Sequence, residues 1–242
     1  MHKQLSGLSP YYIFSDDIRK IDLESRFLIN TINQYSFLLA ENDVIFKEAL
    51  ANSDILLPDG IGITFAARLL TRNRLKKITG ADIHAHCLKQ VEEKKGTVLY
   101  VGSTTETMLK VSERITWEYP AIKHVGFICP PYCDTLDLAT NELIINKINS
   151  FKPDVLFVAL GAPKQEKWVF INEHRLNTQT ICCIGAAIDF FANYNRPNKI
   201  LIYLGLEWLV RLWREPYRMA NRYLIGGPVF FAKLLTRKLK RK

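Results

Sequence analysis

The amino-acid sequence predicts an α/β protein, with a mostly parallel β-sheet that is covered by helices on both faces and followed by a basic C-terminal appendage. Three observations predict this class. Short apolar runs alternate with longer amphipathic stretches, most of the runs end at a glycine or another turn residue, and the net positive charge is concentrated in the last fifty residues. Strands that alternate with helices favour parallel pairing, because each crossover connection places a helix on one face of the sheet.

Five short apolar runs are the predicted strands. They are Ile55–Leu57 before Pro58-Asp59-Gly60, Thr97–Val101 before Gly102-Ser103, Ala121–Ile128, Asp154–Leu160 before Gly161, and Thr180–Ile184 before Gly185. Apolar runs of this length, bounded by turn residues, are typical of buried strands.

Six amphipathic stretches between these runs are the predicted helices. They are Asp43–Asn52, Ile61–Leu70, Ala81–Glu93, Thr105–Glu118, Thr135–Ser150 and Pro163–Asn172. Open parallel sheets usually bind their ligands beyond the carboxyl ends of the strands. The residues that directly follow each strand are therefore the first candidates for function.

The charge of the chain divides it into two parts. Residues 193–242 hold twelve Lys/Arg and two acidic residues, and the remaining 192 residues hold twenty-one and twenty-two. A length of 242 residues fits one domain with an appendage. We therefore predict an α/β catalytic core over residues 1–192 and a basic, apolar, helical appendage over residues 193–242. Such an appendage suits a membrane surface, another polyanion or an acidic groove.

Cysteines and apolar segments indicate the compartment. The five cysteines are odd in number and lack a disulfide-framework spacing, which favours a reducing cytosol. The five histidines form no convincing ligand set, so no metal is expected. The N-terminus lacks a signal-peptide core, and no stretch reaches the ~18 apolar residues of a spanning helix. Any membrane contact is expected at the surface.

Three carboxylates near strand or helix ends are candidates for acid–base chemistry. Asp59 follows a strand, where it can act as a general base or cap the helix that starts near Ile61, and spacing alone favours the cap. Asp189 follows a strand end at Gly185. Asp82 stands with Lys77 at a helix start, where capping is favoured over catalysis.

The segment Gly161–Glu166 is a second type of candidate site. Glycine permits a tight turn, Pro163 suits the first helical position, and free N–H groups at a helix start favour a phosphate. Lys164 adds charge, and Gln165 and Glu166 offer hydrogen bonds to sugar hydroxyls. A plain strand-to-helix connection explains the same pattern. The turn at Gly102 has neither the G-x-G-x-x-G nor the Walker pattern, which counts against a dinucleotide enzyme and a P-loop NTPase.

Four arginines in the appendage recur at spacings of three and four. They are Arg211, Arg214, Arg218 and Arg222. On a helix they would line one side, where guanidinium groups suit diphosphate oxygens. A solvated basic face is the alternative, and it is weakened by the neighbouring Trp208 and Trp213, because tryptophan favours interfaces.

Taken in order, eight sequence blocks resemble the WecG/TagA/CpsF glycosyltransferase family, glycosyltransferase family 26. The blocks are Thr31-Ile32-Asn33, Leu57-Pro58-Asp59-Gly60-Ile61-Gly62, Thr79-Gly80-Ala81-Asp82, Gly161-Ala162-Pro163-Lys164-Gln165-Glu166-Lys167-Trp168, Gly185-Ala186-Ala187-Ile188-Asp189, Glu207-Trp208-Leu209-Val210-Arg211-Leu212, Arg214-Glu215-Pro216-Tyr217-Arg218 and Arg222-Tyr223. The resemblance covers the chain from about Asn30 to Tyr223. No single block is decisive, and their order and spacing make the resemblance specific.

The resemblance implies a Rossmann-like core that transfers a sugar, most simply of the N-acetylmannosamine type, from a UDP-sugar with inversion. The implied acceptor is a polyprenyl-diphosphate-linked sugar at the cytoplasmic face of the cell membrane, in cell-surface polysaccharide biosynthesis. Asp59 is the implied base, and Thr31, Asn33 and Gln165 belong to the implied sugar-nucleotide pocket, with Lys77, Asp82 and Asp189 as further substrate contacts. The arginine row is linked to catalysis and membrane association.

Further expectations concern cofactors and partners. No metal-binding DxD pair is evident, so no cofactor is expected and the arginines are candidates to neutralise the UDP leaving group. The tail would bind anionic membrane, nucleic acid is not an expected partner, and a homo-oligomer is compatible with the sequence. Two departures from the resemblance are Lys77, where many members have arginine, and Val101-Gly102-Ser103, where Gly-Gly is common.

Two other classes of function remain as alternatives. The α/β pattern alone suggests a nicotinamide-dependent oxidoreductase, but the glycine fingerprint with its downstream acidic partner is missing. The basic tail alone suggests a nucleic-acid-binding module, but the body is nearly neutral and contains no reader motif.

Overall fold

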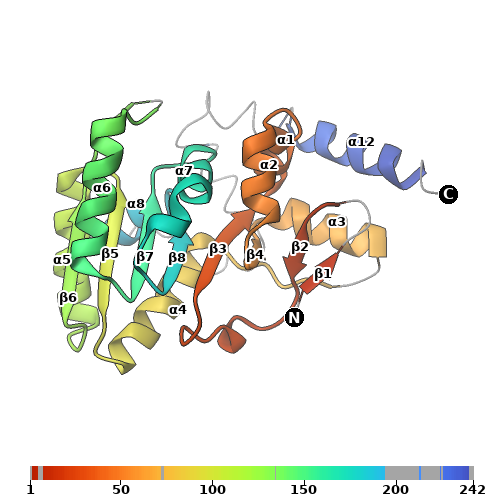
Figure 1. Ribbon diagram of the computed structural model, residues 1–242. Coiled ribbons are helices and arrows are strands. Elements are labelled where there is room, and N and C mark those ends of the chain that lie inside the picture. The colour runs from red at the N-terminus through yellow and green to blue at the C-terminus, as the bar shows by residue number, and fades with distance from the viewer. Residues whose placement is uncertain are drawn as a thin grey trace.

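A computed structural model shows one eight-stranded sheet with helices on both faces (Figure 1). The structure describes residues 2–4, 8–71, 74–133, 135–193, 213, 224 and 226–239. Seven neighbouring strands are parallel, and one antiparallel strand lies at an edge. The predicted α/β class is confirmed.

The strand order is β1-β2-β4-β3-β8-β7-β5-β6. The strands are β1 (His2–Gln4), β2 (Tyr12–Phe14), β3 (Phe27–Ile32), β4 (Ile55–Pro58), β5 (Thr97–Gly102), β6 (His124–Ile128), β7 (Val155–Ala159) and β8 (Thr180–Cys183). All five predicted strands are present. The sequence did not predict β1, β2 or β3, and β3 is a central strand whose buried Asn30 interrupts the apolar run.

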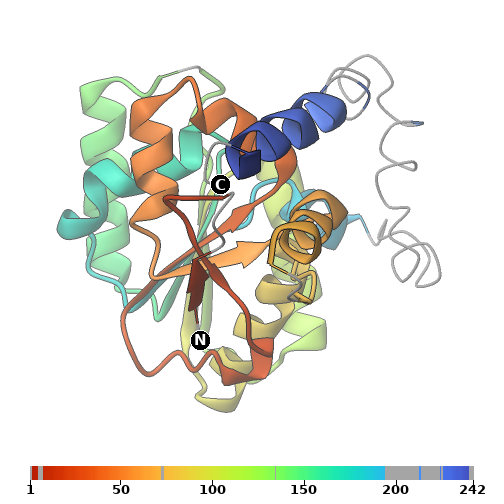
Figure 2. The ribbon, with the colours of Figure 1, turned by 90° about the vertical axis from the view of Figure 1, so that its right-hand side faces the viewer.

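Two layers of helices enclose the sheet. One layer, in front of the sheet in Figure 1, contains α1 (Gln34–Ala40), α2 (Val44–Ala51), α6 (Leu138–Phe151) and α7 (Lys164–Asn172). The other layer contains α3 (Ile61–Thr71), α4 (Gly80–Glu93), α5 (Thr105–Glu118) and α8 (Ala187–Ala192) (Figure 2). Short 3₁₀ helices cover Ile18–Lys20 and Glu173–Arg175. All six predicted helices are present.

The last described helix, α12 (Gly226–Leu239), packs against α1 and α3 at the β2 side of the sheet (Figures 1 and 2). Phe230 and Leu234 are completely buried in the cluster formed with α1, α2 and α3. The ring of Phe230 lies 5.2 Å from that of Phe37 in an edge-to-face arrangement. Part of the predicted basic appendage is therefore helical and contributes to the hydrophobic core. Within the described residues, no helix is long and apolar enough to cross a membrane.

Candidate active site

Asn33 and Asp59 lie next to each other at the carboxyl ends of two central strands. Ile32 of β3 pairs with Pro58 of β4, and the Asp59 N–H donates to the Ile32 carbonyl at 2.9 Å. Each candidate is therefore the first residue after a matched strand end. The helix α3 begins at Ile61, so Asp59 stands one residue before its N-cap position, Gly60. Asp59 is partly exposed, as a base that meets a substrate must be.

The side chain of Asn33 caps α1. Its Oδ1 accepts the Tyr35 and Ser36 N–H groups at 3.0 Å, and the Ser36 hydroxyl accepts the Asn33 N–H. This capping box fixes the side chain, and its Nδ2 group makes no hydrogen bond to another described residue. Thr31 pairs with Leu57 of β4 and is partly exposed.

The segment from Lys77 to Asp82 crosses the ends of the strands beside Asp59. The Ile78 N–H donates to the Pro58 carbonyl at 3.0 Å, which places Lys77 near the end of β4. Asp82 Oδ2 accepts the Thr79 N–H and hydroxyl at 2.9 Å and 2.8 Å, as part of the capping box of α4. The predicted capping role of Asp82 is confirmed, whereas its predicted contact with substrate stays a prediction.

A close approach connects this segment to the end of β8. A Cβ atom on Gly80 would lie 2.9 Å from the Ile184 carbonyl oxygen, which only glycine avoids. The start of α4 therefore packs directly on the turn that leads to α8.

Gln165 lies between the ends of β7 and β8. Its Oε1 accepts the Gly161 N–H at 3.3 Å, and its Nε2 donates to Glu166 Oε1 at 2.8 Å. A Cβ atom on Gly185 would lie 3.6 Å from the Gln165 carboxamide. Gln165 is buried at the start of α7, so both ends of its carboxamide are held by neighbouring groups.

Glu166 is buried, which differs from the expectation that it faces a sugar. Its Oε2 has no hydrogen-bond partner among the described residues, and burial raises the pKa of the carboxyl to about 7. The hydrogen bond from Gln165 opposes this rise. The sequence could not reveal this burial, because it depends on the packing of α7 against β8, where Cys183 is the neighbouring titratable group.

Lys164 is anchored to the loop after β6. Its Nζ donates to the Cys133 carbonyl, so this amine connects the start of α7 to the Cys129–Cys133 loop. The sequence predicts that this amine binds a phosphate. The structure shows that it also donates a hydrogen bond to the backbone of the loop after β6.

Asp189 and Ser103 bring together the turns after β8 and β5. The Ser103 hydroxyl donates to Asp189 Oδ1 at 3.5 Å, and Asp189 is exposed in the first turn of α8. Gly102 has a φ of 123°, and a Cβ atom there would lie 2.4 Å from the Ala159 carbonyl oxygen. Glycine is therefore required where β5 and β7 converge.

The predicted arginine row lies outside the described residues. This applies to Arg211, Arg214, Arg218 and Arg222. In the part of the chain that the structure describes, no group of three or more His, Cys, Asp and Glu side chains could hold a metal ion.

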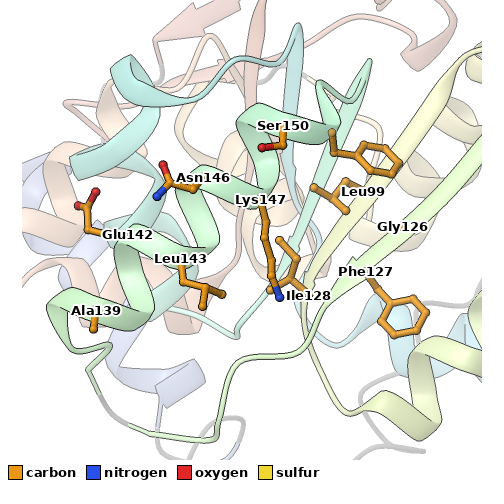
Figure 3. A pocket seen from close by; sticks show the side chains of 11 residues that line it. Leu99, Gly126, Phe127, Ile128, Ala139, Glu142, Leu143, Asn146, Lys147 and Ser150 are labelled. Atoms are coloured by element: carbon orange, nitrogen blue, oxygen red, sulfur yellow. The ribbon is translucent and has the colours of Figure 1, made fainter.

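A cavity formed by described residues lies away from these strand ends. It has a volume of about 800 Å³ and lies between the edge strand β6 and α6, where Leu143 and Lys147 line it (Figure 3). A neighbouring cavity of about 340 Å³ is lined by Thr105 and the loop after β6. None of the predicted site residues lines either cavity. We assign the candidate site to the strand ends, because the groups that can bind and transfer protons are there.

The fold and these residues define an α/β protein with a polar site at the carboxyl edge of a parallel sheet, the usual ligand position in this class. A sequence profile of the glycosyl transferase WecG/TagA/CpsF family matches residues 10–242, and the chain belongs to this family.

Three curated relatives carry the same name, N-acetylglucosaminyldiphosphoundecaprenol N-acetyl-beta-D-mannosaminyltransferase. The protein from Bacillus subtilis (strain 168) is 33% identical over 85% of this chain and 79% of its own length. That from Bacillus spizizenii is 29% identical over 84% and 80%. That from Staphylococcus aureus (strain MW2) is 27% identical over 81% and 75%.

Proposed function

We propose that this protein transfers N-acetylmannosamine from a UDP-sugar to an N-acetylglucosamine linked through a diphosphate to a polyprenol. The observation that carries this proposal is the similarity along most of the chain to relatives named for this acceptor and this sugar. The family match disfavours both alternatives. The absence of a G-x-G-x-x-G turn counts further against a nicotinamide-dependent oxidoreductase, and the nearly neutral body without a reader motif counts against a nucleic-acid-binding module.

The proposed chemistry is a single displacement at the anomeric carbon of the donor. The acceptor hydroxyl oxygen forms the new bond to that carbon, the bond from the carbon to the UDP oxygen breaks, and the hydroxyl proton passes to the carboxylate of Asp59. Asp59 supports this role because it is partly exposed at a strand end beside Asn33, where a ligand of a parallel sheet usually lies.

The proposed donor pocket consists of Thr31, Asn33 and Gln165, with Lys77, Asp82 and Asp189 around it. Gln165 supports this assignment because its carboxamide is held in one orientation by Gly161 and Glu166. A fixed carboxamide loses little entropy when it binds a ligand. Arg211, Arg214, Arg218 and Arg222 are proposed to stabilise the charge that develops on UDP.

We place the protein on the inner face of the cell membrane, held there by its basic residues 193–242. This location supports the proposed reaction because a polyprenyl chain stays in the bilayer.

The direct test is a screen of UDP-sugars with a short-chain polyprenyl-diphosphate N-acetylglucosamine. UDP release and a product heavier by one N-acetylhexosamine are expected with UDP-N-acetylmannosamine. Release of UDP without that product would indicate hydrolysis, and turnover of another donor alone would change the assigned sugar.

A further inference from the structure

Helix α3 has two apolar faces, of which one is buried against the core and the other is exposed to solvent. Ile61, Phe65 and Leu69 are spaced by four residues and are 43%, 52% and 40% exposed. On the opposite side of the helix, Ile63 and Ala67 are completely buried. Single exposed apolar residues are ordinary, but three in a row on one helix face form a continuous stripe.

The neighbouring helix α12 extends this stripe. The ring of Phe65 lies 5.6 Å from the ring of Phe231, so the two helices are in contact (Figure 2). Val229 and Leu235 of α12 are 42% and 47% exposed. We call the exposed residues Ile61, Phe65, Leu69, Val229 and Leu235 of these two helices the α3–α12 surface.

The two sequence segments that contribute the α3–α12 surface carry charge of one sign. Residues 61–77 contain five basic residues and no acidic residue, and residues 226–239 contain three and none. The cations are Arg68, Arg72, Arg74, Lys76 and Lys77, followed by Lys233, Arg237 and Lys238. Arg68 is exposed and lies three residues after Phe65 and seven after Ile61, which places it on their side of α3. Lys76 is offset by Asp17 at 3.6 Å, so its charge is partly compensated.

We propose that the α3–α12 surface binds the anionic surface of a lipid bilayer. Exposed apolar side chains flanked by lysine and arginine, with no acidic residue between them, are the pattern of helices that lie in a membrane interface. The absence of acidic residues from both segments favours anionic lipid over a protein partner, whose surfaces carry both signs of charge. This surface belongs mainly to the α/β core and not to the arginine row of the appendage.

The position of the surface adds a consequence that rests on the proposed function. Ile61 is the first residue of α3 and stands two residues after Asp59. A bilayer bound to this face would place the candidate base near the level of the lipid headgroups, where a diphosphate attached to a polyprenol lies.

The test is co-flotation of the full chain with phosphatidylcholine vesicles, with and without phosphatidylglycerol. The test variant is Ile61→Gln/Phe65→Gln/Leu69→Gln. The control is Leu109→Gln/Trp117→Gln/Ile171→Gln, which removes from α5 and α7 three apolar residues that are at least as exposed, at 52%, 78% and 56%. We expect the test variant to bind anionic vesicles about tenfold more weakly, because three apolar side chains no longer enter the interface, and the control to bind like the wild type.

Equal flotation of the test variant and the control would overturn the proposal. A second outcome would also overturn it: the wild type is a dimer, the test variant is a monomer, and both float equally. The surface would then be an interface between two copies of the chain. Since Phe65 contacts Phe231, the double variant Ile61→Gln/Leu69→Gln is measured as well, and circular dichroism checks both folds.

Flotation requires no sugar, so it separates the two proposals. If the wild type floats but turns over no UDP-sugar, the proposed function is contradicted, and membrane binding by the α3–α12 surface still stands. A wild type that turns over a short-chain acceptor, while the test variant floats normally, contradicts the surface alone.

Discussion

Asn33 and Asp59 are held side by side by the strand register, since each follows one member of the Ile32–Pro58 pair and a backbone hydrogen bond of 2.9 Å joins Asp59 to Ile32. The distance between them is therefore determined by two central strands and not by a loop. A change in the Asp59 side chain leaves this backbone bond intact, whereas a change in the Asn33 side chain would also remove the cap of α1.

Asp59→Asn is expected to retain UDP-sugar binding and to lose turnover. Loss of a general base typically costs ~10²–10⁴-fold in rate. Steady-state kinetics and donor binding by calorimetry measure the two effects. Asp189→Asn is measured in parallel as the rival candidate for the base, because Asp189 is exposed at another strand end. If Asp189→Asn loses turnover and Asp59→Asn does not, the role of base belongs to Asp189.

Thr79→Ala is expected to lower the free energy of unfolding by ~1 kcal/mol, because it removes the cap of α4. Its hydroxyl both donates to Asp82 Oδ2 and accepts the Asp82 N–H. Urea denaturation measures the change. Thr116→Ala, at an exposed position within α5, is the control and is expected to be nearly neutral. An unchanged midpoint for Thr79→Ala would mean that the capping box contributes nothing.

Glu166 is expected to make the protein less stable as the pH rises. Its pKa is about 7 in the folded protein because of burial, above the model-compound value of 4.5. The folded state therefore holds a proton that the unfolded state has lost between pH 4.5 and 7, so the free energy of unfolding falls across that window and is constant above it.

Glu166→Gln removes this dependence and is expected to raise the free energy of unfolding at pH 8, relative to the wild type, by up to ~3 kcal/mol. Denaturation at pH 5 and pH 8 measures it. A wild type and a variant with the same pH dependence would contradict the assigned pKa.

His84 is expected to cause the opposite dependence in acid. It is buried, its Nε2 lies 2.7 Å from the Tyr100 hydroxyl, and desolvation, followed by the charge of Arg114, lowers its pKa to about 3. Below pH 6.5 His84 binds a proton in the unfolded chain but stays neutral in the folded protein. The free energy of unfolding therefore falls as the pH falls from 6.5 towards 3.

The double variant His84→Phe/Tyr100→Phe removes both hydrogen-bond partners at once and is expected to lose this acid sensitivity. His84→Phe alone leaves the Tyr100 hydroxyl buried without its partner, at a cost of ~1–3 kcal/mol. A single variant as stable as the double variant at neutral pH would show that the hydrogen bond is unimportant.

Much of the fold was predictable because most strands are apolar runs between turn residues, as at Thr97–Gly102 and Val155–Ala159. Strand β3 was not predictable, because Asn30 is buried there through a hydrogen bond to Ser53, a contact that forms only in the folded protein. The strands β1 and β2 have three residues each, too few for a periodic pattern.

For the candidate site, the sequence located the strand ends and the cap at Asp82. It did not reveal the burial of Glu166 or the bond of Lys164 to the loop after β6, because both depend on which elements pack together. The apolar residues of α12 illustrate the same limit. The side chains of Phe230 and Leu234 suit a bilayer or a protein interior equally, and only the structure shows that they are core residues.

Because Phe230 and Leu234 are buried against α1, the N-terminal part of the core is completed late in protein synthesis. Residues from the start and the end of the chain share one apolar cluster, so that cluster cannot close until residue 234 has been made. The rest of the sheet, from β3 to β8, can assemble earlier on the ribosome. We therefore expect a nascent chain that stops before α12 to keep Phe37 accessible to chaperones, even when its parallel strands are already paired.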